Sequence, residues 1–160
     1  YLGLKALSNK VKFKNKDKLF FVDKYYKPEL PLNLTKYLLK FANSSIDVSD
    51  GLIDDLAKMI NRQSLSFHLF ENKIPVSNKL SNLIKKQRLN KINLISNGDD
   101  YQVLFTADIK KARIIQKASK TTGIKITKIG KIVSGKDRSL IFDEKGKQIR
   151  AKSKGYIHRF

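Results

Sequence analysis

Residues 44–60 read SSIDVSDGLIDDLAKMI, and this stretch decides the fold class because its periodicity changes in the middle. Ser44 to Val48 read as a short extended segment. From Leu52 onward apolar side chains recur at the three- and four-residue spacing of an amphipathic helix, and Ser49 stands where a helix N-cap is expected. The stretch therefore predicts a strand that runs directly into a helix.

The flanking sequence continues this alternation of helices and strands. Gly123 follows one predicted helix and should end it. The last predicted strands are joined by short turns, whereas residues 10–18 read as a solvated loop. We therefore predict an α+β domain with a mixed or antiparallel sheet covered by helices. Predicted helices lie near 34–41, 52–60, 77–89 and 109–122, and predicted strands near 44–48, 65–69, 101–106, 124–126, 129–132, 140–142 and 149.

Length and composition bound the class of protein. The chain has 160 residues, two His and no Cys, which suits one domain without disulfides, a thiolate zinc site or a Cys nucleophile. The absence of Cys favours a reducing, cytoplasmic setting. Apolar runs are far shorter than the roughly 20 residues that span a bilayer, so no membrane partner is expected.

The charge is strongly positive, because 34 Lys and Arg against 14 Asp and Glu leave a net +20. Such a balance raises the question of nucleic-acid binding. The lysines are spread along the whole chain, however, and no stretch interleaves them with aromatic residues as single-strand binders do. We interpret the charge as a solvated surface, with a basic RNA-binding module as the alternative function.

Acidic residues cluster at the predicted strand-to-helix junction, where Asp47, Asp50, Asp54 and Asp55 fall within nine positions. One interpretation is structural, since negative charge is favoured near a helix N-terminus. The other is chemical: Asp47 and Asp50 can converge at the end of the strand and hold Mg²⁺. Gly51 and the first-turn amides would then admit a phosphate group.

Two further motifs carry polar or aromatic groups. Residues 97–105, Asn-Gly-Asp-Asp-Tyr-Gln-Val-Leu-Phe, form either a simple turn entering a strand or a ligand loop. Residues 155–160, Gly-Tyr-Ile-His-Arg-Phe, either stack on a flat ligand or dock on the core. His68 lies in a strand pattern beside Phe67, and we interpret it as structural.

In this order the motifs resemble the C-terminal half of the thiamine-monophosphate kinase family, which belongs to the aminoimidazole-ribonucleotide synthetase-like superfamily. The family pattern is Ile-Asp-[Ile/Val]-Ser-Asp-Gly-Leu before a helix with Asp-Leu, then Gly-Gly-[Glu/Asp]-Asp-Tyr-Glu-Leu-Leu-Phe, Ile-Gly-x-Ile, and a terminal Gly-aromatic-x-His-Phe. The matching stretches here are 46–56, 97–105, 129–132 and 155–160. The resemblance covers about 130 residues.

The resemblance implies an enzyme that transfers the γ-phosphoryl group of ATP to thiamine monophosphate, giving thiamine diphosphate, with Mg²⁺ neutralising the phosphates. No residue of this half would be catalytic in its own right. Asp47 and Asp50 would bind Mg²⁺ and Ser49 would contact ATP. Asp99 would contact the substrate, and Tyr156 would lie against the thiamine moiety.

The resemblance also implies that residues 1–160 are one C-terminal, substrate-side domain of a longer enzyme. The family's N-terminal ATP-binding domain is absent, and the full-length protein would be a homodimer. Asn97 and Gln102 replace a Gly and an acidic residue of the pattern, and Arg159 leaves Tyr156 and Phe160 as alternatives for the aromatic role. Another ATP-dependent synthetase of the superfamily is the alternative enzyme.

Overall fold

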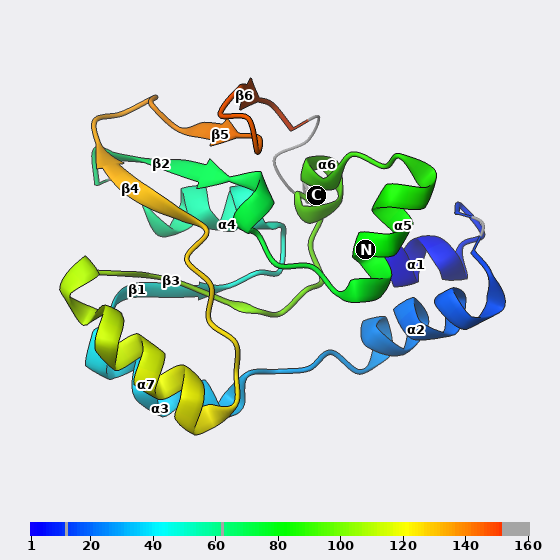
Figure 1. Ribbon diagram of the computed structural model, residues 1–160, viewed down its shortest axis with the longest axis horizontal. Helices are drawn as coiled ribbons and strands as arrows, with labels where there is room; N and C mark the ends of the chain where they lie inside the picture. The colour runs from blue at the N-terminus through cyan, green and yellow to red at the C-terminus, as the bar shows by residue number, and fades with distance from the viewer. Residues whose placement is uncertain (12, 62, 152–160) are drawn as a thin grey trace, which may run out of the picture.

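The computed structural model describes residues 1–11, 13–61 and 63–151. Its described part begins with three helices, continues with a mixture of strands and helices, and ends with three strands (Figure 1). The α-helices are α1 (Leu2–Leu7), α2 (Asn15–Tyr26), α3 (Leu32–Phe41), α4 (Leu52–Met59), α5 (Asn78–Gln87), α6 (Lys91–Ile95) and α7 (Ala112–Thr122), with short 3-10 turns η1 (Glu71–Lys73) and η2 (Ile109–Lys111). The strands are β1 (Ala42–Asp47), β2 (Leu65–Phe70), β3 (Val103–Ala107), β4 (Gly130–Ser134), β5 (Leu140–Phe142) and β6 (Gln148–Ile149).

The strands form two sheets. β1 and β3 make an antiparallel pair, and the second sheet has the order β4-β2-β5-β6. Within the second sheet β2 is antiparallel to β4 and parallel to β5, while β5 and β6 are antiparallel. The predicted α+β class with a mixed sheet is therefore confirmed, although the strands are divided between two sheets.

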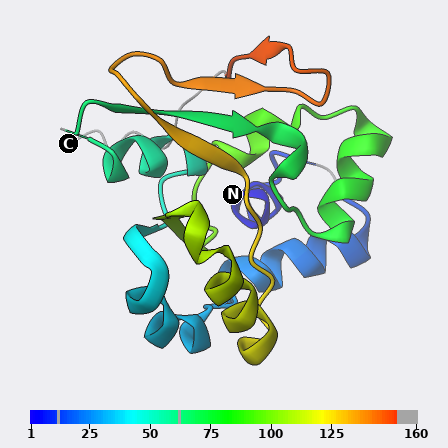
Figure 2. The same ribbon diagram turned by 60° about the vertical axis from the view of Figure 1, so that its left-hand side comes forward.

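The elements stack in layers, with α4 between the two sheets and α3 and α7 on the far side of the β1–β3 pair (Figures 1 and 2). One apolar core joins α4, the second sheet and Leu104 of β3. A second core, built on Leu34, Phe41 and Ala118, joins α3 to α7 and receives Phe105 of β3. The β1–β3 pair is thus held from both faces, which fixes the strand-to-helix junction after β1.

Predictions for residues 15–18 and 124–126 are wrong. Residues 15–18, expected as loop, are the first turn of α2, because α2 packs on α1 and buries Phe21 in contact with the ring of Phe13. Residues 124–126 are not a strand, since β4 begins only at Gly130; Ile124 and Ile126 pack on the α3–α7 core without strand pairing. Among the described residues, no helix is long and apolar enough to cross a bilayer.

Candidate functional site

The two motif loops leave the β1–β3 pair at the same end. Because the strands are antiparallel, Asp47 at the end of β1 lies opposite Val103 at the start of β3. The loop that follows β1 and the loop that precedes β3 therefore run side by side, joined by backbone hydrogen bonds. These run from Val48 N to Gln102 O (2.9 Å), from Tyr101 N to Val48 O (2.8 Å) and from Asp99 N to Ser49 O (2.9 Å).

Two glycines allow this close approach. Gly98 is buried, and a Cβ added there would lie 1.7 Å from the carbonyl oxygen of Ser49. Gly51 has φ +135°, and its added Cβ would lie 2.4 Å from the carbonyl oxygen of Ser96. Each loop thus places a glycine against the backbone of the other, and no side chain fits at either contact.

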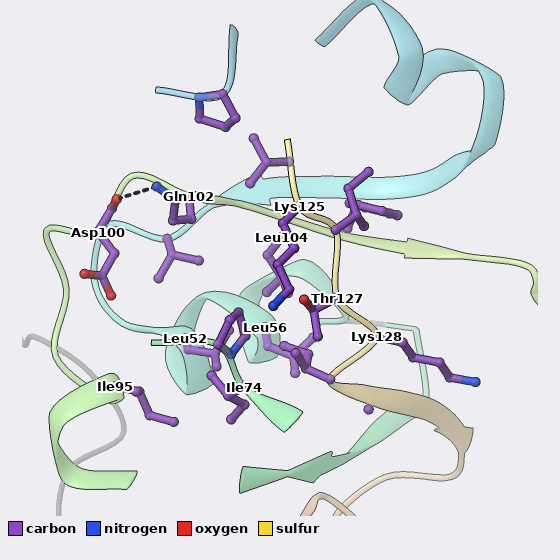
Figure 3. A pocket seen from close by; sticks show the side chains of 18 of the residues that line it. Leu52, Leu56, Ile74, Ile95, Asp100, Gln102, Leu104, Lys125, Thr127 and Lys128 are labelled. Atoms are coloured by element: carbon purple, nitrogen blue, oxygen red, sulfur yellow. Dashed lines mark hydrogen bonds between the residues drawn. The ribbon is translucent and has the colours of Figure 1, made fainter. Parts of the chain in front are cut away.

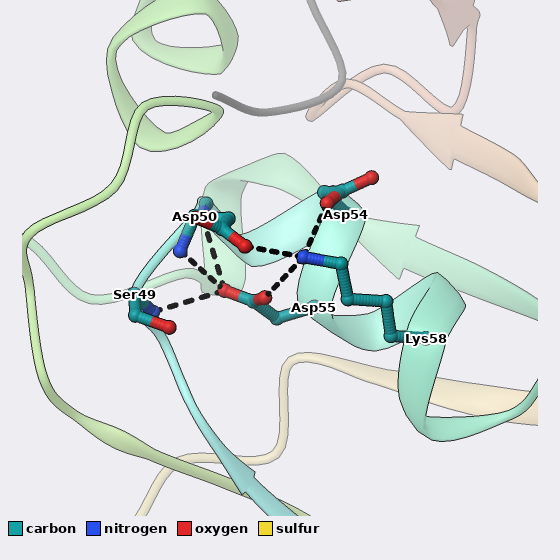
Figure 4. A network of polar contacts seen from close by, with 6 residues as sticks. Ser49, Asp50, Asp54, Asp55 and Lys58 are labelled. Carbon is teal, nitrogen blue, oxygen red and sulfur yellow. Dashed lines mark hydrogen bonds and ion pairs between the residues drawn. The ribbon is translucent and has the colours of Figure 1, made fainter. Parts of the chain in front are cut away.

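Asp55 organises the loop before α4. Its carboxylate is buried, and Oδ2 accepts hydrogen bonds from the backbone N–H groups of Ser49, Asp50 and Gly51, each at 3.0 Å (Figure 4). The N-cap of α4 is Gly51, without a side-chain cap bond, so the prediction that Ser49 caps the helix is wrong. These three amides are also not available to a phosphate, because the protein's own carboxylate already occupies them.

Three carboxylates and one ammonium group meet where the loop before α4 lies against this helix: Asp50 is on the loop, Asp54 and Asp55 on the first turn and Lys58 on the last turn. Asp50, Asp54 and Asp55 each offer one oxygen within 4.8 Å of the others. Lys58 Nζ lies among them, at 2.7 Å from Asp54 Oδ2, at 3.3 Å from Asp55 Oδ1 and in contact with Asp50 Oδ2 (Figure 4). The hydrogen bond to Asp50, followed by that to Asp54, raises the pKa of Lys58 above its usual value. The cluster therefore holds a cation that the chain itself supplies.

The donor set of this cluster fits a divalent cation. Carboxylate oxygens are the ligands that Mg²⁺ prefers, and Asp50 and Asp54 keep partial solvent access. Asp55 is nearly enclosed and has already committed Oδ2 to backbone amides. A bound cation would have to take the position where the Lys58 ammonium lies.

Three of the five predicted site residues lie on the two adjoining loops. Ser49 and Asp50 lie on the loop before α4, and Asp99 lies on the adjoining loop, so these three are brought together. Asp47 is exposed at the end of β1 and is not a member of the three-carboxylate cluster. Tyr156 lies outside the described residues. The ligand roles of these residues stay predictions.

The loop before β3 has an unusual backbone. Asp99 has φ +67° and Tyr101 has φ +51°, a region that non-glycine residues seldom adopt. Hydrogen bonds to Ser49 and Val48 hold both residues there. Strained backbone of this kind concentrates at functional sites, which favours a ligand loop over the simple turn that the sequence left open.

Asp100, between these two residues, has a perturbed carboxyl group. Its side chain still reaches solvent, but the surrounding chain displaces much of the water around the carboxyl. This desolvation raises the pKa of Asp100 to about 6, an effect that the nearby Asp99 carboxylate reinforces. A carboxyl that titrates near neutral pH is a candidate functional group.

A cavity of about 1220 Å³ opens between the two sheets beside this loop. Its walls include Leu52 and Leu56 of α4 and Leu104 of β3, and Asp100 lies at its edge (Figure 3). Thr127 also lines the cavity, and its Oγ1 is the one buried side-chain polar atom without a hydrogen-bond partner in the described part of the chain. A ligand at the motif loop would therefore have an apolar wall beside it.

Sequence reasoning missed the roles of Asp55 and Lys58. A signal for Lys58 was present, because it follows Asp54 by four residues and Asp55 by three, the spacing at which helical side chains meet. No sequence signal reveals the amide contacts of Asp55, since they depend on the curvature of the loop before the helix.

No protein-family model matches the chain. It is similar to curated proteins named thiamine-monophosphate kinase. That of Buchnera aphidicola subsp. Schizaphis graminum is 32% identical over 158 residues, which cover 98% of this chain and 48% of the relative. That of Escherichia coli K12 is 27% identical over 157 residues, with the same coverage. The chain thus spans about half the length of the curated relatives it matches.

Solved structures give the same result. The crystal structure of thiamine monophosphate kinase from Aquifex aeolicus superposes with a TM-score of 0.65 at 26% identity, covering 92% of this chain and 46% of that chain. AaThiL complexed with AMPPCP and TMP superposes with a TM-score of 0.70 at 25% identity, covering 97% of this chain and 47% of that chain. The predicted resemblance to the thiamine-monophosphate kinase family is confirmed.

Proposed function

We propose that this chain, which is similar to thiamine-monophosphate kinases over nearly its whole length, forms the C-terminal, substrate-side half of such an enzyme. The enzyme would transfer the γ-phosphoryl group of ATP to the phosphate of thiamine monophosphate. The AMPPCP and TMP bound to AaThiL support these two ligands. The observation that carries the proposal is the joining of the Ser49–Gly51 loop to the Gly98–Tyr101 loop by backbone hydrogen bonds.

The chemistry follows from charge. Two phosphate groups must approach one another, and Mg²⁺ bound at this end of β1 would neutralise their oxygens. Asp47 and Asp50 would hold the metal from the end of β1 and from the loop that follows it. Asp54, which offers a carboxylate oxygen within 4.8 Å of one from Asp50, would be a further ligand. With the phosphates so positioned, no residue of this half needs to form a covalent intermediate.

The remaining site residues would bind the organic parts of the ligands. Ser49 would contact ATP from the loop that Asp55 holds, and Asp99 would contact thiamine monophosphate from the adjoining loop. The apolar wall of the cavity at Leu104 supports a place for an aromatic ring near Asp99. Tyr156 would add a stacking surface from the C-terminal motif.

The other half of the enzyme would cover part of this chain. Among the described residues, exposed large apolar side chains concentrate in the first three helices and the segments between them, which is unfavourable for a surface in water. Packing against an N-terminal ATP-binding domain would bury them, and the full-length enzyme would be a homodimer. The exposed apolar residues of this region are Leu4, Leu7, Leu19, Tyr26, Leu30, Leu32 and Leu39.

Substitution of the proposed metal ligands in the intact protein tests this function. Asp47→Ala and Asp50→Ala should each lower Mg²⁺-dependent formation of thiamine diphosphate at least a hundredfold, because each removes a charged ligand. Glu144→Ala is the control, since it removes an exposed carboxylate from the β5–β6 turn. Undiminished activity of both Asp variants would refute the metal role. Turnover of an aminoimidazole precursor instead of thiamine monophosphate would favour the alternative synthetase.

A further inference from the structure

Asp55 is a buried carboxylate at the site for which the proposed reaction has no direct use. Only 1% of the residue is exposed, so its carboxylate is screened from a ligand in solution. Oδ2 accepts three backbone N–H bonds at 3.0 Å, from Ser49, Asp50 and Gly51, and Oδ1 faces Lys58 Nζ at 3.3 Å. Resting on the proposed function, we propose that Asp55 is a positioning residue that fixes the backbone carrying Ser49 and Asp50.

Three consecutive amides that converge on one oxygen determine the local backbone. Each bond is accepted by a carboxylate and is therefore charge-assisted, which makes it stronger than a bond between neutral groups. Gly51, at φ +135°, supplies the backbone turn that lets the third amide point inward. Because the loop is curved around Asp55, these bonds fix the backbone positions from which the side chains of Ser49 and Asp50 extend.

Asp54, the preceding residue, shows what Asp55 does differently. Its side chain is 32% exposed, and it forms an ion pair with Lys58 on the next turn of the same helix. Asp55 also contacts Lys58, but most of its bonds run backward to the loop. Asp54 can therefore change partners when a cation arrives, whereas Asp55 cannot leave the loop without uncovering three buried N–H groups.

The first experiment compares Asp55→Asn with Ser66→Ala in the intact protein. Ser66 on β2 is as buried as Asp55. Its hydroxyl donates to Gly135 O at 2.7 Å and accepts from Arg138 N at 3.0 Å. Loss of this hydroxyl therefore also destabilises the fold, but in the β4-β2-β5-β6 sheet and away from the loop before α4. Assayed well below both melting temperatures, Asp55→Asn should lower kcat about tenfold or more. It should also raise the Mg²⁺ concentration at half-maximal rate several-fold, with partial recovery in excess Mg²⁺.

Ser66→Ala should change neither quantity. Wild-type Mg²⁺ dependence in folded Asp55→Asn, or an equal change in Ser66→Ala, would overturn the positioning role, because a general loss of stability would then account for the effect.

The second experiment does not require activity. Amide hydrogen exchange at Ser49, Asp50 and Gly51 should be at least tenfold faster in Asp55→Asn than in the wild type, while the amides of β2 exchange at unchanged rates. Unchanged protection of the three loop amides would overturn the proposal. If instead the amides respond but the intact wild type does not phosphorylate thiamine monophosphate, the proposed function fails and the role of Asp55 in the loop stands.

Discussion

Gly98→Ala should separate the two motif loops. The added Cβ would lie 1.7 Å from Ser49 O and 2.6 Å from Ser49 C, whereas carbon and oxygen atoms in contact lie about 3.3 Å apart. The two backbones must therefore move apart by roughly 1.6 Å, the difference between these distances. Gly98 does not have a positive φ, so the whole effect of the substitution comes from this contact.

A separation of that size breaks the hydrogen bonds that join the loops. Three backbone bonds of 2.8 to 2.9 Å link Val48 and Ser49 to the segment 99–102. At about 0.5–1.5 kcal/mol each, their loss should lower the free energy of unfolding by about 3 kcal/mol. The loop that bears Ser49 and Asp50 would be displaced at the same time, so activity should fall together with stability.

Urea denaturation of the intact protein measures this change. Gly123→Ala is the control, because Gly123 has φ +69° but its added Cβ meets no atom within 4 Å. The control carries only the strain of the left-handed backbone, about 1–2 kcal/mol. If Gly98→Ala costs no more than Gly123→Ala, the contact between the loops is not as close as the structure has it, and the reasoning is refuted.

Two further predictions concern charge. Lys58→Met removes the ammonium that contacts Asp50, Asp54 and Asp55, so the intact variant should bind Mn²⁺ several-fold tighter than the wild type in calorimetry. Lys86→Met is the control, because it removes a lysine charge from the exposed side of another helix. Equal Mn²⁺ affinity of the two variants would contradict the inference that Lys58 occupies the cation position. Because the pKa of Asp100 is raised to about 6 from a usual value near 3.9, the folded state binds more protons than the unfolded state between these values. Stability should therefore fall as pH rises from about 4 to about 6, and Asp100→Asn should flatten this dependence in pH-resolved denaturation; an unchanged slope would contradict it.

Much of the local structure could be predicted from periodicity and turn chemistry. The helix at 109–122 is found as η2 followed by α7, and it ends at Gly123 in the left-handed conformation, as predicted. Ser77 caps α5 by accepting a bond from Leu80 N at 3.2 Å. These features depend on a few neighbouring residues, so the order of residues along the chain is enough to specify them.

The errors arose where distant contacts override local preference. The loop expected at 15–18 is helical because α1, which was not predicted, packs against α2, and Gly3 permits the approach: an added Cβ there would lie 2.3 Å from Phe21 O. Ser49 does not cap α4, because Asp55 reaches back to the amides that a cap would use. Both the helix at 15–18 and the missing Ser49 cap depend on contacts between separate segments, so neither can be predicted from one segment alone.

The order of motifs along the chain by itself determined the family resemblance, the α+β class and the residues to examine, because each motif is a short run of neighbouring residues. Only the tertiary structure decided how the motifs act together. Antiparallel pairing of β1 with β3 carries residues 48–51 and 98–102 to one edge, and two glycines let their backbones touch. Hydrogen bonds and ion pairs act over a few ångströms, so the roles of Asp55 and Lys58 exist only after folding has brought their partners within that range.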